Sequence, residues 1–355
     1  GHATVSTGVY PTRAGIPANA WREGEDSEHV YNVADPTVGL VGFPGLPGSS
    51  PKVLRRGGLA DWVLQADSDA RVVSVSAKDR GAILLAGQSK GEVYWYDPQV
   101  GGFVTSTYYR SRNPSWLDRF NAGEMQEYLA DSVWTSTVPT SAAHLSAPDT
   151  AGFEGDGVHT FFPHSYLEEM VDPEPGDIQF WFETTPMLDR ATLDLALLAM
   201  EEEDLGQSND RTDFLAISFS QTDRIGHSYG PLSREQMDNL LRLDRVLDDL
   251  FSALDEEVGS DNYAHGFTSD HGTMDSPERR EGGGLRLTAI HRSEMESALS
   301  AAARQSNFRM GVSPGQAMVE AMKDLPFVGP AYTHEVLEGP PSSDPMVKLF
   351  QNSYT

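Results

Sequence analysis

The segment from residue 213 to residue 268 constrains the fold most, because it predicts two buried strands joined by a long helix. Residues 213–219 (Asp-Phe-Leu-Ala-Ile-Ser-Phe) and residues 263–268 are runs of strand length. Between them, residues 233–256 have apolar side chains at the spacing of an amphipathic helix, with Ser233 as a suitable N-cap. This order favours a right-handed crossover between two parallel strands. The expected fold class is α/β, with a mostly parallel sheet flanked by helices.

Other parts of the chain agree with this fold class. We expect further helices at 3–8, 58–65, 189–203, 291–305 and 315–322, a strand at 71–76, and loops at 38–50 and 277–284. From about residue 95 to residue 188 the chain is rich in aromatic residues, Pro, Ser and Gly without a clean period, which indicates an inserted cap. A second insertion is expected at about 275–330. The 355 residues are otherwise expected to form a single domain.

The charge balance excludes some classes of partner. Asp and Glu number 53 against 26 Lys and Arg, which gives a net charge of -27. This field repels nucleic acid, so we expect no nucleic-acid binding, and any anion site needs local cations or metals. The chain has no cysteine, so a zinc site would have to use His and Asp. No apolar stretch approaches the roughly 20 residues of a membrane helix, so no membrane span is expected.

Two polar motifs directly follow the predicted strands. They are Asp223-Arg-Ile-Gly-His227 and Asp270-His271, the latter within Ser-Asp-His-Gly. The carboxyl ends of parallel strands meet at one edge of a sheet, where α/β proteins bind ligands. Oxygen and nitrogen ligands without sulfur are compatible with zinc. The two motifs therefore predict a metal-dependent hydrolase, although for one motif alone a turn at Asp223 and a packed His227 would explain the pattern.

Two cations follow the predicted strand at 71–76. Residues two apart in an extended segment point the same way, so Lys78 and Arg80 are expected to face one ligand. Arg suits bidentate contact with a phosphoryl group, and Lys adds a compact charge. The alternative is a pair of solvated charges. Asn19 can donate an amide hydrogen to an anion, or cap a turn.

Together these residues resemble the alkaline phosphatase superfamily, most closely its periplasmic PafA-like monoesterases. The resemblance extends along the whole chain, and Lys-x-Arg is its most specific element. The matching stretches besides those named above are Gly1-His2-Ala3-Thr4, Thr7-Gly8, Gly15-Ile16, Tyr94-Trp95-Tyr96-Asp97, Thr105-Ser-Thr-Tyr-Tyr109 and Leu243-Asp244-Arg245.

The resemblance implies a site with two zinc ions. Asp223 and His227 would bind one ion, and Asp270 and His271 the other. Asn19, Lys78 and Arg80 would hold the nonbridging phosphoryl oxygens of the substrate, with Lys78 and Arg80 as the catalytic cations. The implied reaction is hydrolysis of small phosphate monoesters through a covalent phosphothreonine. The implied protein is a monomer in the periplasm or secreted.

The resemblance also implies that the domain is incomplete at both ends. The threonine nucleophile of such enzymes would lie three residues before Gly1, and a further histidine ligand would follow Thr355. We therefore expect the intact parent to be an alkaline phosphatase, and the 355 residues alone to show negligible turnover and weak zinc affinity. His334 is read as structural.

Two other functions stay open from the sequence. A phosphodiesterase or nucleotide pyrophosphatase of the same superfamily would bind the second ester group on an apolar surface, for which Trp95, Tyr108, Tyr109 and Trp116 are candidates. A catalytically inactive acidic domain that binds a metal or a partner is the other alternative.

Overall fold

The computed structural model describes the chain in two compact units, Gly1–Met274 and Asp275–Thr355. The described residues exclude 24–27, 131–132, 152–153, 156, 171, 173, 175, 276–288, 307–311, 327 and 355. The expected single domain with a second insertion at about 275–330 stays a prediction.

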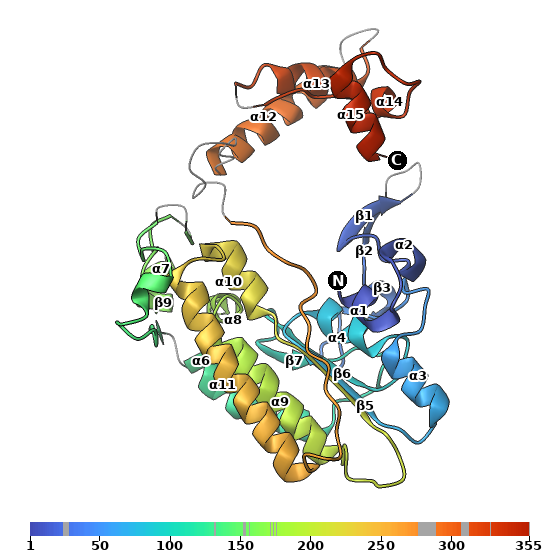
Figure 1. Cartoon of the computed structure of the whole chain (residues 1–355), viewed down its shortest axis with the longest axis vertical. Helices are drawn as coiled ribbons and strands as arrows, with labels where there is room; N and C mark the ends of the chain where they lie inside the picture. Colours follow the sequence, from blue (N-terminus) through green and yellow to red (C-terminus); the bar gives the residue numbers. More distant parts are fainter. Residues whose placement is uncertain are drawn as a thin grey trace. The chain divides into compact units, whose positions relative to one another are not determined.

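A four-stranded sheet forms the centre of the first unit (Figure 1). Its strands, in spatial order, are β10 (Phe214–Ser218), β5 (Val72–Ser76), β6 (Glu92–Asp97) and β7 (Gly102–Val104). β10, β5 and β6 run parallel, and β7 runs antiparallel to β6. The predicted strands at 71–76 and 213–219 are confirmed, as is the mostly parallel α/β fold.

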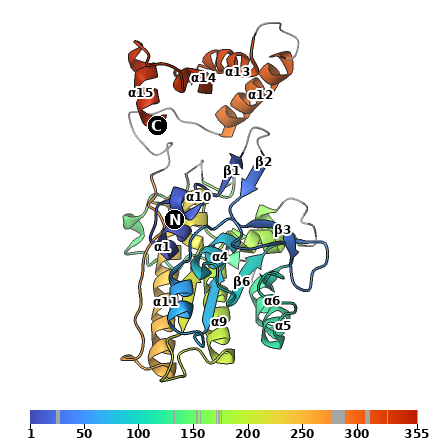
Figure 2. The same cartoon turned by 90° about the vertical axis from the view of Figure 1, so that its right-hand side faces the viewer.

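Helices cover both faces of this sheet (Figures 1 and 2). Side chains alternate between the faces along each strand. Val75 and Tyr94 point into a core completed by α9 (Met187–Glu202). Val93 and Trp95 point into the opposite core, completed by α4 (Asp79–Ala86) and α1 (His2–Thr7). The result is the helix–sheet–helix layering of an α/β protein.

The long helix α11 (Arg234–Glu257) packs against α9. Its N-cap is the predicted Ser233, whose hydroxyl accepts the amide of Gln236 at 3.0 Å. The helices predicted at 3–8, 58–65, 189–203 and 233–256 are confirmed within one or two residues. The other elements of the unit are α2 (Pro11–Ala14), β1 (Ala20–Glu23), β2 (Glu28–Tyr31), β3 (Ala34–Gly39), β4 (Pro47–Ser49), α3 (Leu59–Ala66), α5 (Ser115–Ala122), α6 (Glu124–Ala130), β8 (Val133–Trp134), η1 (Ala143–Leu145), β9 (His164–Ser165), α7 (Tyr166–Glu169), α8 (Asp177–Phe182) and α10 (Gln221–Tyr229). β3 and β4 pair across the segment expected to be loop.

The strand predicted at 263–268 is wrong, and so is the crossover built on it. These residues have no strand partner and pass α11 as extended chain (Figure 1). The side chain of Phe267 is 71% exposed, and Gly266 offers no side chain to pack. The hydroxyl of Tyr263 donates to Asp255 of α11 at 2.8 Å. The apolar residues of this run are therefore not buried in the sheet.

The predicted cap at 95–188 begins too early. Its first residues lie in β6 and β7, whose Tyr96 and Phe103 are buried in the main core together with residues of α5 and α6. A separate aromatic cluster includes Trp134, Trp181 and Tyr229. It packs the small β8–β9 sheet and its helices against α10. Tyr94, Trp95 and Tyr96 are consecutive in β6 and are buried on both faces of the sheet, so the sequence shows no alternation of apolar and polar residues there.

The second unit is helical in its described part. It contains α12 (Ala289–Ser306), α13 (Pro314–Lys323), α14 (His334–Leu337) and α15 (Pro345–Tyr354), which confirms the helices predicted at 291–305 and 315–322. The loop predicted at 277–284 lies outside the described residues. His334 forms an ion pair with Glu338 at 3.0 Å, one turn along α14. None of the helices in the described part of the chain has the length and hydropathy required of a membrane span.

Candidate metal and phosphate site

Asp223 is the centre of a polar cluster beyond the end of β10. It lies in the first turn of the helix α10. Its Oδ1 is 3.3 Å from Nε2 of His227, one turn along the helix, and 3.6 Å from Nε2 of His271. Its Oδ2 accepts a short hydrogen bond from the ammonium group of Lys78. The residues of both sequence motifs therefore meet at one carboxylate.

Asp270 extends this cluster toward the start of the chain. Its Oδ1 is 3.6 Å from Nε2 of His271, and its Oδ2 is 3.2 Å from Nδ1 of His2. Nε2 of His2 is in turn 2.9 Å from Oγ of Ser218, the last residue of β10. Gly1 lies so close to Asp270 that an added Cβ would be 2.3 Å from the Asp270 Cβ. Only glycine fits there without a shift of Asp270.

Burial and neighbouring charges both shift the pKa values of the side chains in the cluster. Burial lowers the pKa of Lys78, although the hydrogen bond to Asp223 opposes this. Burial also acts to raise the pKa of Asp223, but the hydrogen bond and charge of Lys78 outweigh it and the net pKa is lowered. For His2, burial is the main cause that lowers the pKa to about 4. His2 is therefore a neutral imidazole at neutral pH.

Lys78 and Arg80 do not share one direction. Lys78 keeps the expected extended backbone as the N-cap of α4, but the helix begins at Asp79, so Arg80 lies in its first turn and the extended segment does not reach it. Nη1 of Arg80 donates to the hydroxyl of Tyr31 at 3.4 Å, and that hydroxyl donates to Asp79 at 2.5 Å. Both cations still act on His2, since the charges of Arg80 and Lys78 each lower its pKa.

Asn19 lies directly before β1 and is exposed. Its backbone carbonyl accepts the amide of Asn32 at 3.0 Å. In the part of the chain that the structure describes, we find no contact between its side chain and the cluster. Its role in phosphate binding stays a prediction.

The donor types of the cluster fit zinc. The carboxylate–imidazole separations of 3.3 to 3.6 Å among the predicted ligands are close to the spacing of about 3.4 Å between neighbouring ligands on a tetrahedral ion with bonds of about 2.0 to 2.1 Å. However, over the described ranges no group of three or more His, Cys, Asp or Glu is arranged to hold a metal ion. The predicted ligands are therefore brought together as pairs. His2 was missed as a member of the cluster, and its signal was the Gly1-His2 stretch of the resemblance.

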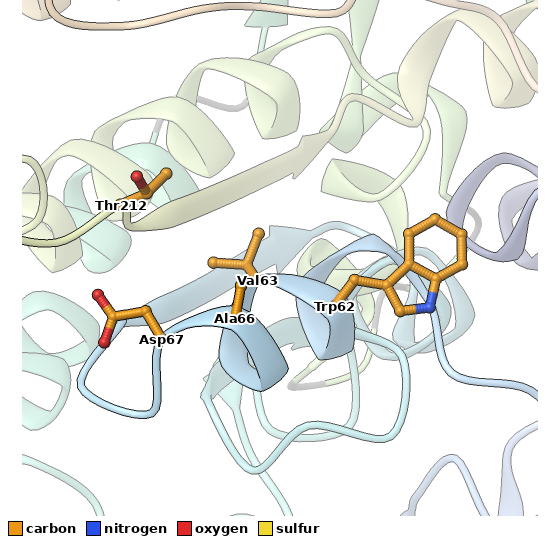
Figure 3. A pocket seen from close by; sticks show the side chains of 5 residues that line it. All are labelled: Trp62, Val63, Ala66, Asp67 and Thr212. Carbon is orange, nitrogen blue, oxygen red and sulfur yellow. The ribbon is translucent and has the colours of Figure 1, made fainter.

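The first unit also contains a pocket of about 330 Å³ that is formed by other residues. It is lined by Trp62, Val63, Ala66 and Asp67 at α3 and by Thr212 just before β10 (Figure 3). Its lining includes the carboxylate of Asp67 but no cation, and it contains no residue of the cluster. It does not suit a phosphate ester.

Comparison with known protein families shows to which family the chain belongs. The sequence pattern of the family described as type I phosphodiesterase / nucleotide pyrophosphatase matches residues 1–324. The chain belongs to this family. Like the predicted resemblance, the match runs through both Asp/His motifs, the Lys-x-Arg stretch and Asn19.

Within the type I phosphodiesterase / nucleotide pyrophosphatase family, similar relatives are named alkaline phosphatases. The chain is 36% identical to alkaline phosphatase PhoV of Synechococcus elongatus over 282 residues, which cover 78% of this chain and 50% of PhoV. It is 35% identical to alkaline phosphatase PafA of Elizabethkingia meningoseptica over 282 residues, which cover 78% of this chain and 51% of PafA. The chain thus spans about half the length of these relatives.

The fold of this family member agrees with a solved structure. The crystal structure of wild-type alkaline phosphatase PafA matches with a TM-score of 0.71 and 28% sequence identity, over 98% of this chain and 71% of that chain. The resemblance to PafA-like alkaline phosphatases is confirmed.

Proposed function

We propose that the cluster around Asp223 and Asp270 forms a two-zinc site that hydrolyses small phosphate monoesters. The observation that supports this most directly is the position of His271, whose Nε2 lies 3.6 Å from one oxygen of each aspartate. Membership of a phosphoesterase family and relatives named alkaline phosphatases support the reaction class.

Each ion would be held by residues of one motif. Asp223 and His227 would bind one zinc, and Asp270 and His271 the other. When bound, such a pair of ions polarises the phosphoryl oxygens, activates the nucleophile and stabilises the leaving oxygen. His2 would orient Asp270, because Nδ1 of its imidazole lies 3.2 Å from Oδ2 of Asp270 while Nε2 is held 2.9 Å from the hydroxyl of Ser218.

Lys78, Arg80 and Asn19 would bind the phosphoryl group. The net charge of -27 repels phosphate at long range, so local cations are required at the site. A phosphate monoester has one more charged nonbridging oxygen than a diester. Lys78, which contacts Asp223, and Arg80, whose charge acts on His2, would therefore favour the monoester. The amide of Asn19 would donate to the same oxygens.

The nucleophile implied by the resemblance is a threonine that forms a phosphothreonine. Thr7 is not proposed for this role, since it is buried in α1 and its hydroxyl donates to the carbonyl of Ala3 at 2.6 Å. We further propose that the protein acts as a monomer in the periplasm or after secretion, as the resemblance implies.

A phosphodiesterase is the second candidate, because the matching family bears that description. To distinguish a monoesterase from a phosphodiesterase, we compare the rates at which the zinc-loaded protein hydrolyses p-nitrophenyl phosphate, a monoester, and bis(p-nitrophenyl) phosphate, a diester. The assay is run on the 355 residues and on a longer chain read from the flanking coding sequence. We expect faster turnover of the monoester, abolished by Asp270→Ala. A preference for the diester would support the second candidate, and zinc binding without turnover in either chain would indicate an inactive domain.

A further inference from the structure

Asp189 is a buried carboxylate to which the proposed chemistry assigns no part. It lies in the first turn of α9 and is only 2% exposed. Its Oδ1 accepts the backbone amides of Ser220 at 2.8 Å and Gln221 at 3.3 Å. Its Oδ2 has no hydrogen-bond partner among the described residues. A carboxylate with one orphaned oxygen is costly to bury, so its retention requires an explanation.

The two amides that Asp189 accepts are those that begin α10. The first amides of a helix have no partner within the helix, and the N-cap side chain usually satisfies one of them. Ser220 is the N-cap of α10, but its side chain does not cap the helix and lies 3.3 Å from the hydroxyl of Ser76. Asp189 therefore supplies the cap from another helix, and its charge suits the positive end of the helix dipole.

A second contact ties the same two helices together. The side-chain amide of Gln221 donates to the carbonyls of Glu183 at 2.9 Å and Thr185 at 2.6 Å, immediately before α9. The start of α10 is thus fixed to the start of α9 by backbone and side-chain bonds. Asp223 lies two residues after Gln221 in α10. Whether its carboxylate reaches His271 therefore depends on how α10 is rotated about its axis.

We propose that Asp189 is a positioning residue that orients α10 so that Asp223 and His227 face Asp270 and His271. The inference rests on the proposed function, because orientation of this pair matters only if the pair binds a ligand. Residues that orient metal ligands through hydrogen bonds typically affect metal affinity by about 10- to 100-fold.

Three variants of the 355-residue chain test the proposal. Asp189→Ala removes the acceptor, and Asp189→Asn keeps an oxygen acceptor of the same size. Asn is a close mimic because burial raises the pKa of Asp189 to about 7, so its carboxyl is partly protonated at neutral pH. Thr192→Val is the matched control, since Thr192 is buried on α9 and its hydroxyl donates to Leu188 within that helix.

Amide hydrogen exchange of the peptide covering residues 219–229 is the deciding measurement. We expect Asp189→Ala to speed exchange there by at least about tenfold, Asp189→Asn to restore most of the protection, and Thr192→Val to leave it unchanged. Unchanged protection in Asp189→Ala, or equal loss in Thr192→Val, would overturn the inference.

Zinc affinity, measured by competition with a chromophoric chelator, separates this inference from the proposed function. We expect Asp189→Ala to weaken zinc binding about 10- to 100-fold relative to the unaltered chain and to Thr192→Val. Loss of protection with unchanged zinc affinity would leave Asp189 as a structural cap and overturn its positioning role. An unaltered chain that binds no zinc contradicts the proposed function itself, whereas the exchange data still report whether Asp189 holds α10.

Discussion

Nε2 of His271 lies 3.6 Å from Oδ1 of Asp223, which joins the segment after α11 to the first turn of α10. The same nitrogen lies 3.6 Å from Oδ1 of Asp270. This arrangement brings the two sequence motifs together without the predicted strand at 263–268. The cluster therefore forms because the extended segment that follows α11 brings Asp270 and His271 to the first turn of α10. It does not require a second parallel strand.

Asp270→Ala should remove zinc binding from one half of the cluster. The substitution deletes the carboxylate that His271 and His2 both approach, so we expect at least about a 100-fold loss of affinity for that ion, at the upper end of what loss of an orienting residue costs. Zinc stoichiometry and affinity are measured by chelator competition. Asp210→Ala, an exposed aspartate outside the cluster, is the control. Equal affinity in both variants would contradict the ligand assignment.

Arg80→Ala should change substrate preference. Loss of one positioned donor to transition-state charge typically costs about 10²- to 10³-fold in rate. We expect a loss of that size in kcat/KM for p-nitrophenyl phosphate, and a much smaller loss for bis(p-nitrophenyl) phosphate. The zinc-loaded protein with the flanking sequence is assayed beside Arg13→Ala, which changes an exposed arginine of α2. Equal losses on the two esters would remove Arg80 from the phosphoryl site.

Lys78→Met should destabilise the protein in a zinc-dependent way. The Lys78 side chain is 9% exposed and that of its partner Asp223 is 28% exposed, so removal of the ammonium leaves a poorly solvated carboxylate. We expect the free energy of unfolding to fall by about 1 to 3 kcal/mol, less than for a fully buried pair. Saturating zinc should reduce this loss, because zinc at Asp223 would replace the missing positive charge.

The control for Lys78→Met is Lys52→Met, which breaks a lysine–aspartate pair at 3.1 Å with Asp35. The Lys52 side chain is 49% exposed, and Asp35, although buried, keeps its hydrogen bonds from Thr37 and Ser50 when the ammonium is removed. We therefore expect a loss of about 1 kcal/mol or less, and no dependence on zinc. Chemical denaturation with and without zinc measures both variants. A loss in Lys78→Met that zinc does not change would argue against metal binding at Asp223.

His164 should make stability depend on pH in the alkaline range. Burial opposes its charge, but hydrogen bonds to Glu169 at 2.8 Å and Glu235 at 3.2 Å outweigh this and raise its pKa to about 9. A group whose pKa is higher in the folded state than in the unfolded state stabilises the folded protein while it is protonated. For His164, this stabilisation is complete below the unfolded-state pKa of about 6.5 and is lost as the pH rises through 9. We expect the free energy of unfolding to fall by about 2 to 3 kcal/mol across this range.

Denaturation curves at pH values across this window test the assignment. His164→Gln should be less stable than the unaltered chain near neutral pH and should lose the alkaline slope. His144→Gln, at an exposed histidine of η1, should retain it. An alkaline slope that persists in His164→Gln would assign the titration to another group.

Local sequence patterns predicted the elements whose stability is local. Ser233 caps α11 as expected, and Gly8 closes α1 in the left-handed conformation with φ of 64°. The helix periods and the β-branched run at 71–76 also gave correct elements. These features depend on neighbours in the chain, which the sequence displays directly. The failures at 263–268 and at the start of the cap concern pairing and burial, which depend on distant residues.

The sequence by itself determined the fold class, the chemistry of the candidate site and the family. Asp, His, Lys and Arg at specific spacings define which ligands and charges are present, and this information does not depend on coordinates. The tertiary structure decided which of these side chains meet. Lys78 bonds to Asp223 while Arg80 bonds to Tyr31, because a helix starts between them, and His2 of α1 contacts Asp270 of the segment after α11. Side-chain direction and long-range contact follow from packing of the whole unit, which no local pattern specifies.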